Sequence, residues 1–508
     1  MKPEFDVTVI GLGPTGTLTS LLLDDSSINV LGIDKEKEPY NLPRAVTMDD
    51  EGLRIMQRLN LESIYLDNGT RLEGAYFLDD KLNKISGMDL ERNFLTQNGW
   101  MPTLLFHQPY TDELLRKQLM DSNCFIKLQT ELIDIIPKDN YYVIKTLDIA
   151  KNKEESYTTQ YVLGSDGASS KVRKIMQIDH ENLDYDKNWL VVDVELKNEN
   201  TLPKYAAQIC DPKRICTYIP AHLPFRRWEF VLLDHETKED VLEQKKIQEL
   251  ISPWLKAEDY KIIRSTVYRF HSLLAKSFKK DNCFIMGDAA HQNPPFMGQG
   301  MMSGYRDALN LSWKLNGIFK KYFSESVLRS YETERKPHSR FVVEGSAAIG
   351  KLMSAYAEGV EKGDISSTPK ELVKKGYGSF SIPPLKEGIL YNGSSSKNTM
   401  AGYIFPQPLL MEGLECKERL DDLLGNNFCV VSKKKIKLTK SEEKFYRKIN
   451  ARFCLMEKDL LESNSAINSL MNESDTYILR PDRHIFGSTS DNITFSELTN
   501  DLEKRLGN

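Results

Sequence analysis

Three glycines near the N-terminus have the spacing of a phosphate-binding turn. Gly11, Gly13 and Gly16 follow an apolar run over residues 5–10 that predicts a buried strand, and an apolar helical stretch comes next. In such a unit the first glycine permits a tight turn, the second lets a pyrophosphate approach the backbone, and the third lets the helix pack on the strand. Asp34 ends the next predicted strand, where a carboxylate can accept hydrogen bonds from ribose hydroxyls. The pattern predicts dinucleotide binding and leaves FAD and NAD as alternatives.

A second glycine-containing turn spans residues 164–173 and lies between an apolar strand and a basic helix. Asp166 could hold a loop or a hydroxyl, Gly167 permits close approach, and Arg173 could meet an anion. Taken alone, the segment favours an ordinary turn with a serine at the helix N-cap.

A third motif begins where the predicted strand 283–286 ends. Asp288 lies at the carboxyl end of that strand, which is where ligands sit in open α/β sheets. Pro294 and Pro295 predict a rigid loop, and residues 298–300 (Gly-Gln-Gly) open a long helix whose first N–H groups lack partners. The positive end of such a helix would stabilise negative charge on a ligand.

In this order, the three motifs resemble the FAD-dependent aromatic hydroxylases, the single-component flavoprotein monooxygenases related to p-hydroxybenzoate hydroxylase. The 3-(3-hydroxyphenyl)propionate hydroxylase branch is the most similar, through residues 43–45, 106–109, 189–193, 226–230 and 331–335. The resemblance covers roughly residues 1–345 and is weaker over 385–487. That tail is similar to the thioredoxin-like domain of phenol and polyketide hydroxylases, but it lacks CxxC.

The resemblance implies a set of FAD-binding residues. The glycine turn would hold the pyrophosphate, Asp34 the adenosine ribose and Asp288 the ribityl chain. Arg44 would lie near the FAD phosphates and the path along which the flavin swings. Met302 stands where the family usually has Asn, which matters only if a side-chain amide is needed. The complete cofactor-binding set is Gly11, Gly13, Pro14, Gly16, Asp34, Lys35, Arg44, Gln108, Asp166, Asp288, Pro295, Gly298, Gly300, Met301 and Met302.

The resemblance also implies hydroxylation of a phenolic or aromatic-acid substrate through a flavin C4a-hydroperoxide, with dioxygen and NADH or NADPH. This chemistry needs a pocket that excludes water. The predicted catalytic residues are Arg44, Pro295, Tyr218 and Tyr268, and the predicted substrate pocket contains Phe296, Met297, Arg226 and Trp228. His107 is a further candidate base, whereas His291 is expected to brace the Asp288 loop. Arg226 or Arg227 could pair with a substrate carboxylate, with inter-strand ion pairing as the alternative.

Two other functions stay open at this point. One is a tailoring oxygenase that hydroxylates, epoxidises or carries out Baeyer–Villiger oxidation of a larger polyketide-type substrate. The other is a non-catalytic FAD-binding protein, which would bind FAD without ligand-stimulated oxidation of a nicotinamide.

The predicted fold class is α/β: a Rossmann-like FAD-binding domain with an inserted β-sheet substrate domain and a C-terminal thioredoxin-like domain. A change to scattered Gly, Pro, Ser and Lys near residues 364–400 marks the boundary before the last domain. The ranges are 1–80, 100–185 and 265–350 for the FAD-binding domain, 81–99 and 186–264 for the substrate domain, 351–384 for a connecting segment, and 385–508 for the thioredoxin-like domain.

Composition limits the partners. The 508 residues carry 68 Lys and Arg against 73 Asp and Glu, a formal net charge of −5, which gives no support to nucleic-acid or anionic-membrane binding.

Seven cysteines without CxxC or zinc-ligand spacing predict reduced thiols, a cytoplasmic location and no metal site. The apolar stretch 7–23 is interrupted by glycines and a proline, so we expect no export signal or membrane span. The expected partners are a small aromatic substrate and dioxygen, and a homodimer stays open.

Overall fold

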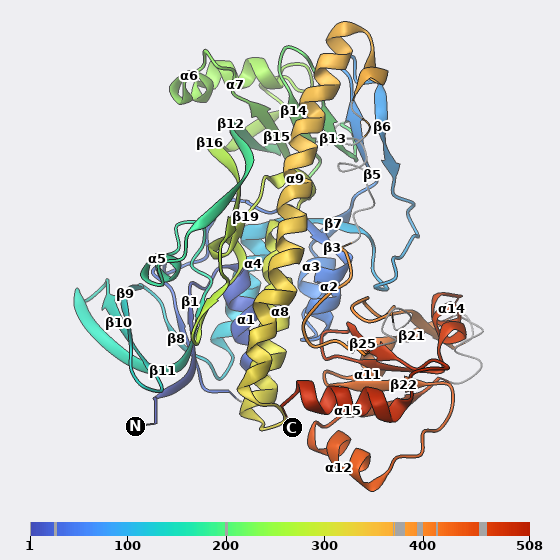
Figure 1. The fold of residues 1–508 in the computed structure, drawn as a ribbon. Coiled ribbons are helices and arrows are strands. Elements are labelled where there is room, and N and C mark those ends of the chain that lie inside the picture. Colours follow the sequence, from blue (N-terminus) through green and yellow to red (C-terminus); the bar gives the residue numbers. More distant parts are fainter. Residues whose placement is uncertain are drawn as a thin grey trace.

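The structure is a computed structural model (Figure 1). It describes residues 2–24, 28–198, 202–368, 370, 382–393, 400–412, 415–456 and 465–507.

The first sheet is built around a buried parallel strand, β1 (Phe5–Ile10), which lies between β2 (Val30–Ile33) and β11 (Lys153–Gly164). The strand order is β17-β18-β11-β1-β2-β8, with β18 at Cys283–Ile285, β17 at Lys279–Lys280 and β8 at Phe125–Lys127. The strands β9 (Thr130–Pro137) and β10 (Tyr142–Asp148) extend β11 as an antiparallel arm. Because β1, β2, β11 and β18 are mutually parallel, their carboxyl ends meet at one edge, where the three sequence motifs come together.

Helices pack on this sheet and lead into a small three-stranded sheet. The helices are α1 (Pro14–Asp24), α2 (Asp50–Gln57), α3 (Ser63–Leu66), α4 (Gln108–Met120), α5 (Lys171–Ile175) and α8 (Gly300–Phe319). The small sheet has the order β3-β7-β4, with bounds Thr47–Asp49, Thr103–Phe106 and Gly69–Arg71. Along the chain, β5 and β6 of the second sheet come between its strands β4 and β7.

The second sheet has eight strands in the order β19-β16-β12-β15-β14-β13-β5-β6. Their bounds are β5 Gly74–Leu78, β6 Lys84–Asp89, β12 His180–Leu196, β13 Ala206–Ile209, β14 Cys216–Ile219, β15 Phe225–Val231, β16 Tyr260–Ala275 and β19 His291–Gln292. The sheet therefore starts earlier and ends later than the predicted substrate domain, because β5 and β19 lie outside its limits and β12 and β16 cross them. The helices α6 (Lys238–Leu242) and α7 (Gln244–Ile251) connect β15 to β16.

One long helix, α9 (Ser330–Lys362), joins the two sheets and runs along the length of the molecule in Figure 1. It extends 12 residues beyond the predicted end of the FAD-binding domain at residue 350, into the range predicted as a connecting segment. Residues 369 and 371–381 of that range lie outside the described residues. Among the helices that the structure describes, none combines the length and the apolar composition that a membrane span needs.

The C-terminal unit has a four-stranded sheet in the order β23-β22-β24-β25. Its elements are β22 (Cys429–Ser432), α12 (Lys440–Lys448), β23 (Arg452–Leu455), α14 (Ser465–Glu473), β24 (Thr476–Leu479), β25 (Ile485–Ser488) and α15 (Phe495–Arg505). Only β22 and β23 are parallel, and the βαβαββα connectivity is that of a thioredoxin fold. A hairpin of β20 (Leu409–Glu412) and β21 (Glu415–Arg419) and helix α11 (Leu420–Leu424) precede it. The predicted fold class is confirmed.

Candidate active site

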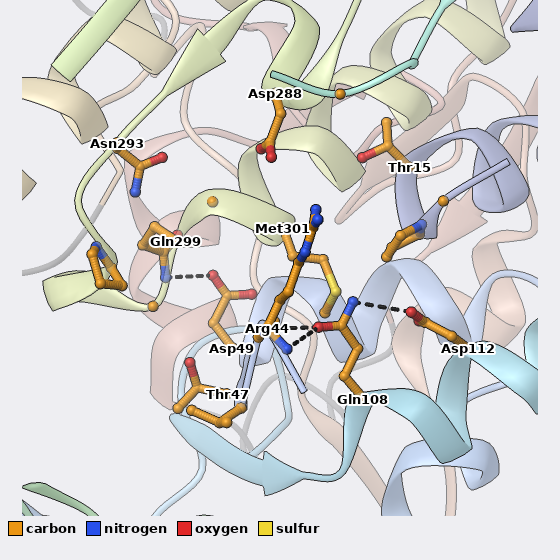
Figure 2. A pocket seen from close by; sticks show the side chains of 18 of the residues that line it. Thr15, Arg44, Thr47, Asp49, Gln108, Asp112, Asp288, Asn293, Gln299 and Met301 are labelled. Atoms are coloured by element: carbon orange, nitrogen blue, oxygen red, sulfur yellow. Dashed lines mark hydrogen bonds between the residues drawn. The ribbon is translucent and has the colours of Figure 1, made fainter. Parts of the chain in front are cut away.

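A cavity of about 1830 Å³ extends from the carboxyl edge of the first sheet to one face of the second sheet. Its walls contain residues of all three sequence motifs together with residues of β13, β14 and β15. Pockets of 300–1,000 Å³ are usual for a single small ligand, so this cavity has room for a cofactor and a substrate. Figure 2 shows ten of the lining residues with labels.

Each of the three positions in the turn has a different structural reason to be glycine. Gly11 has φ +88°, and a Cβ there would lie 2.7 Å from the backbone of Asp166. A Cβ on Gly16 would lie 1.9 Å from the carbonyl oxygen of Gly11, because α1 packs directly against β1. At Gly13 nothing lies within 4 Å of an added Cβ, so this position is open toward the cavity. The geometry matches the three roles that the spacing predicts.

Beside the far end of the turn, the described part of the chain leaves several buried polar atoms without a hydrogen-bond partner. Asp34 accepts hydrogen bonds from the backbone N–H of Leu12 at 2.9 Å and from Nη2 of Arg116 at 3.2 Å. Nε and Nη1 of Arg116 and Oδ1 of Asp112 are buried and have no hydrogen-bond partner among the described residues. Burial raises the pKa of Asp112 to about 7. Buried polar groups are nearly always hydrogen-bonded, so these atoms fit a site for a polar ligand such as the ribose and phosphates of FAD.

Gln108 fixes the segment that carries Arg44. Its Oε1 accepts hydrogen bonds from the backbone N–H groups of Arg44 at 3.0 Å and Ala45 at 2.6 Å, and its Nε2 donates to Asp112 at 3.0 Å. The guanidinium of Arg44 lies 4.6 Å from the ring centre of Tyr40. Figure 2 shows Arg44 and Asp288 extending into the cavity. Gln108 thus positions Arg44 in this structure, and its predicted contact with FAD stays a prediction.

Asp288 follows β18 in a short 3₁₀ turn, Gly287–Ala289, and its carboxylate faces the cavity. The surrounding protein desolvates this carboxyl and raises its pKa, while His291 and Arg44 oppose the shift. His291 itself contacts Asp307 at 2.7 Å, and Asp307 also accepts a hydrogen bond from the backbone N–H of Gly287 at 3.0 Å. His291 is therefore part of the brace behind the Asp288 loop, as expected from the sequence.

Asp166 lines the cavity and also caps a helix. Its carboxylate accepts hydrogen bonds from the backbone N–H groups of Lys171 at 2.6 Å and Val172 at 3.0 Å, at the start of α5. Gly167 has φ +78° and nothing within 4 Å of an added Cβ. The serine cap that the sequence favours is present, since Ser170 accepts a hydrogen bond from Arg173 N–H.

The start of α8 also opens onto the cavity. Its N-cap residue, Gln299, makes no capping hydrogen bond with its side chain, so the first N–H groups of the helix stay available. Gly298, with φ +64°, makes the turn into the helix, and Gly300 and Met301 line the cavity. Met302 is 1% exposed and packs in the core, so only its backbone N–H could serve a ligand.

The predicted substrate residues divide into two groups. Phe296 and Met297 line the cavity, and Phe296 packs against Trp189 with ring centres 5.1 Å apart. Arg226, Trp228 and Tyr218 do not line it, and their prediction as pocket or catalytic residues is corrected. Side chains alternate along a strand, and these three point to the other face of the sheet, where Trp228 packs against Tyr218 and Trp254.

Tyr218 and Tyr268, the two tyrosines predicted as catalytic residues, both lie outside the cavity lining. Tyr218 donates a hydrogen bond to the carbonyl oxygen of Pro203 at 2.8 Å, so its hydroxyl is already used. Tyr268 accepts from Nη1 of Arg264 at 3.4 Å and is not among the lining residues. His107 lies flat on Phe225, with ring centres 4.2 Å apart. The other predicted cofactor residues that line the cavity are Pro14, Asp34, Lys35 and Pro295.

Several lining residues were absent from the sequence prediction. Arg306 of α8 pairs with Asp49 and Glu51, and Asp50 accepts a hydrogen bond from Asn98 at 2.9 Å. Burial raises the pKa of Asp50 to about 6. Glu229 of β15 lines the cavity beside Arg227. The signal for Glu229 was its spacing of two from Arg227, which places both on one face of a strand.

Comparisons with known proteins agree with this geometry. A family model described as "FAD binding domain" matches residues 4–346. A probable NADH-specific resorcinol 4-hydroxylase of Rhodococcus jostii is 27% identical over 437 residues, 85% of this chain and 79% of the relative. A 3-(3-hydroxy-phenyl)propionate/3-hydroxycinnamic acid hydroxylase of Burkholderia vietnamiensis is 27% identical over 469 residues, 88% of this chain and 83% of the relative.

Solved structures share the fold over the whole chain. Aklavinone-11 hydroxylase, solved with FAD and aklavinone, superposes with a TM-score of 0.83 at 17% identity, covering 100% of both chains. The flavin-dependent monooxygenase PieE, solved with FAD and substrate, gives a TM-score of 0.82 at 14% identity and covers 100% of both chains. With the family model matching about two thirds of its length, the chain belongs to the FAD binding domain family.

Proposed function

We propose that this protein is an NAD(P)H-dependent flavoprotein monooxygenase that hydroxylates a phenolic or aromatic-acid substrate. The observation that carries the proposal is the single cavity that joins the glycine turn, Asp288 and the start of α8 to the face of the second sheet. One end suits a dinucleotide cofactor, and the other end provides a separate wall for a small aromatic molecule.

The chain's own residues would bind, orient and shield the reactants. FAD, when bound, supplies the activation of dioxygen. Gly13, Arg44 and Asp288 would hold its phosphates and ribityl chain, and the N-terminus of α8 would stabilise negative charge on its ring. Phe296 and Met297 would exclude water from the reacting centre. In the overall reaction one oxygen atom enters a ring C–H bond, the other leaves as water, and the nicotinamide supplies two electrons.

The relatives support this assignment by the reactions in their names, which are hydroxylations of resorcinol and of 3-(3-hydroxyphenyl)propionate or 3-hydroxycinnamic acid. The NADH-specific relative makes NADH the first nicotinamide to try. The cysteines whose side chains the structure describes are all free, which supports a reducing, cytoplasmic location.

The test is nicotinamide oxidation by purified, FAD-loaded protein, measured with and without each member of a panel of phenols. The panel includes resorcinol and 3-(3-hydroxyphenyl)propionate, and hydrogen peroxide is assayed in parallel. We expect at least one phenol to accelerate oxidation with little peroxide and to gain one oxygen atom from labelled dioxygen. Bound FAD with no stimulation by any phenol would contradict the proposal and favour the non-catalytic alternative.

A further inference from the structure

The wall of the cavity on the second sheet contains a carboxyl group without a hydrogen-bond partner among the described residues. Glu229 lies in the middle of β15, between Thr217 on β14 and Val191 on β12. Its side chain is 2% exposed, yet it lines the cavity. A buried carboxyl is costly unless it is paired, so Glu229 points to a group that arrives with a ligand.

Arg227, the nearest cation, is occupied elsewhere. Nη1 of Arg227 lies 4.0 Å from the Glu229 carboxyl, beyond hydrogen-bond distance. The same guanidinium donates to Asp193 at 2.7 Å and to the carbonyl oxygens of Pro43 at 2.8 Å and Arg44 at 2.6 Å. Arg227 therefore fixes the Arg44 segment to the sheet and leaves the Glu229 carboxyl available to a ligand.

The charges around Glu229 come from three strands. Asp193 on β12 raises its pKa, while Arg227 on β15 and Arg264 on β16 lower it. Burial is the largest effect, and the pKa rises to about 7. On the β14 side, the hydroxyl of Thr217 donates to Oε1 of Gln208 at 2.6 Å, which leaves the Gln208 amide N–H groups for a ligand.

Glu229 faces the part of the cavity where the loop before α8 lies. Phe296 of that loop packs on Trp189, and Trp189 pairs in register with Val231, two residues from Glu229 on the same face. A ring held between this loop and the sheet would thus place a substituent against Glu229. On the FAD-domain side of the cavity, Arg306 is already paired with Asp49 and Glu51.

These contacts also determine the charge that a substrate can carry. Arg227 and Arg264 share Asp193, and Arg306 has two carboxylate partners. A substrate carboxylate near the sheet would therefore compete with existing ion pairs and would meet Glu229 as a like charge. A neutral hydroxyl meets no such penalty.

We propose that Glu229 contacts the phenolic hydroxyl of the substrate and accepts its proton, and that this substrate is an uncharged phenol without a carboxylate. The inference rests on the proposed function. The O–H bond of the phenol breaks, the proton bonds to the Glu229 carboxylate, and the electron pair stays on the phenol oxygen. The ring is then more nucleophilic toward the activated oxygen of the proposed reaction. After hydroxylation, the ring carbon loses its proton to solvent and Glu229 returns its proton to the phenol oxygen.

The first test replaces Glu229→Gln, which keeps the size of the side chain and removes its basicity. General bases contribute about 10²- to 10⁴-fold in rate, so we expect phenol hydroxylation to fall by about that factor. The FAD content of the variant is measured alongside, as the check that it folds and holds the cofactor. Glu195→Gln on the same sheet is the matched control, since Glu195 lies on β12 outside the cavity lining and should leave hydroxylation unchanged. A Glu229→Gln variant with normal FAD content and wild-type hydroxylation would overturn the inference.

The second test uses the wild-type protein and so does not depend on how the variant folds. A base must be ionised to act, so kcat/KM for the phenol should rise with pH and level off above an apparent pKa near 7. This rise of kcat/KM with pH should be absent in any folded Glu229→Gln variant. A profile that is flat across about pH 5.5–8.5 would contradict the role of Glu229.

The third test compares the uncharged and anionic members of the phenol panel. We expect kcat/KM for resorcinol to exceed that for 3-(3-hydroxyphenyl)propionate by at least about tenfold, and the reverse order would overturn the charge assignment. Failure of the proposed function looks different, because then no phenol stimulates NADH oxidation in the wild-type protein. Hydroxylation by wild type that Glu229→Gln leaves intact would refute only the inference about Glu229.

Discussion

At the scale of single residues, Asp288 is the most direct test of the cofactor site. Its carboxylate faces the cavity from the end of β18, and the Asp307 brace holds its loop without using the Asp288 side chain. A carboxylate here can accept hydrogen bonds from sugar-alcohol hydroxyls, each worth about 1.5–3 kcal/mol when one partner is charged. Asp288→Ala should therefore retain at least about tenfold less FAD after desalting, measured by flavin absorbance against protein concentration.

Two further variants separate a lost contact from a disturbed fold. Asp288→Asn keeps hydrogen-bonding capacity and should retain more FAD than Asp288→Ala. Asp80→Ala removes an exposed carboxylate in the turn after β5 and should bind FAD as the wild type does. Wild-type flavin content in Asp288→Ala would show that Asp288 does not hold the cofactor.

Arg44 has its backbone fixed on both sides while its side chain faces the cavity. Gln108 accepts a hydrogen bond from its N–H, Arg227 donates to its carbonyl oxygen, and the guanidinium stacks on Tyr40. We expect Arg44→Ala to slow flavin reduction by the nicotinamide about 10- to 100-fold, because one charge-assisted contact is lost. Arg44→Lys should recover part of the rate, since it restores charge without the planar fork. Stopped-flow reduction under anaerobic conditions measures this directly, and an unchanged rate in Arg44→Ala would count against the role.

At the scale of elements, the sequence motifs correctly predicted which edge of the first sheet borders the cavity. They did not predict which side chains of β15 face the cavity. Three parallel strands with ligand-type residues at their carboxyl ends must bring those residues together, so Asp34 and Asp288 could be placed from sequence. In the run 226–230, by contrast, every residue has a side chain that could suit a pocket. The face is decided by pairing with β12 and β14, which are distant in sequence, and so Glu229 was missed in favour of Trp228.

Helix α8 carries the brace for the Asp288 loop, and Asp307 is its centre. Asp307 is fully buried and contacts His291 at 2.7 Å, Gly287 N–H at 3.0 Å and Arg335 at 2.8 Å. Removing one partner of a buried ion pair typically costs about 3–5 kcal/mol. Asp307→Asn should lower the free energy of unfolding by about this amount and weaken FAD binding as well. Asp179→Asn, which alters an exposed pair with Lys276, should change stability by less than about 1 kcal/mol.

The pH dependence of the same brace has a definite sign. His291 and Arg335 hold the pKa of Asp307 below its usual value. A carboxyl whose pKa is lowered by folding stabilises the protein above its unfolded pKa of about 4, and that stabilisation is lost as the pH falls through the folded pKa. The difference in thermal midpoint between wild type and Asp307→Asn should therefore shrink as the pH falls below about 4. A difference that stays constant with pH would contradict the ionic origin of the brace.

At the scale of the whole molecule, the C-terminal unit docks through buried charges as well as apolar contacts. Trp313 of α8 packs against Phe428 with ring centres 5.8 Å apart, and its indole N–H donates to Asp482 at 3.0 Å. Arg54 of α2 pairs with Asp421 of α11 at 2.8 Å. A thioredoxin-like unit could be predicted from the tail sequence, but these partners are between 115 and 367 residues apart in the chain, so their pairing could not.

Glu334 of α9 is the centre of this docking. Arg480 donates to both of its carboxylate oxygens, at 2.9 and 2.8 Å, and Lys314 of α8 donates at 2.8 Å, with all three side chains fully buried. These cations lower the pKa of Glu334 to about 2. Glu334→Gln leaves two buried cations without their shared anion, which should destabilise the protein by about 3–5 kcal/mol.

Because α8 carries both Lys314 and the cavity-facing helix start, loss of this pairing should affect more than the tail. We expect Glu334→Gln to expose the C-terminal unit to limited proteolysis and to lower the thermal midpoint at neutral pH. The thermal midpoint of the wild type should approach that of the variant as the pH falls from about 4.5 toward about 2, where Glu334 itself becomes protonated. Glu344→Gln on the same helix is the control, because its pair with Arg340 is exposed and should contribute little. Equal stability of Glu334→Gln and wild type at neutral pH would mean that apolar packing alone holds the two parts together.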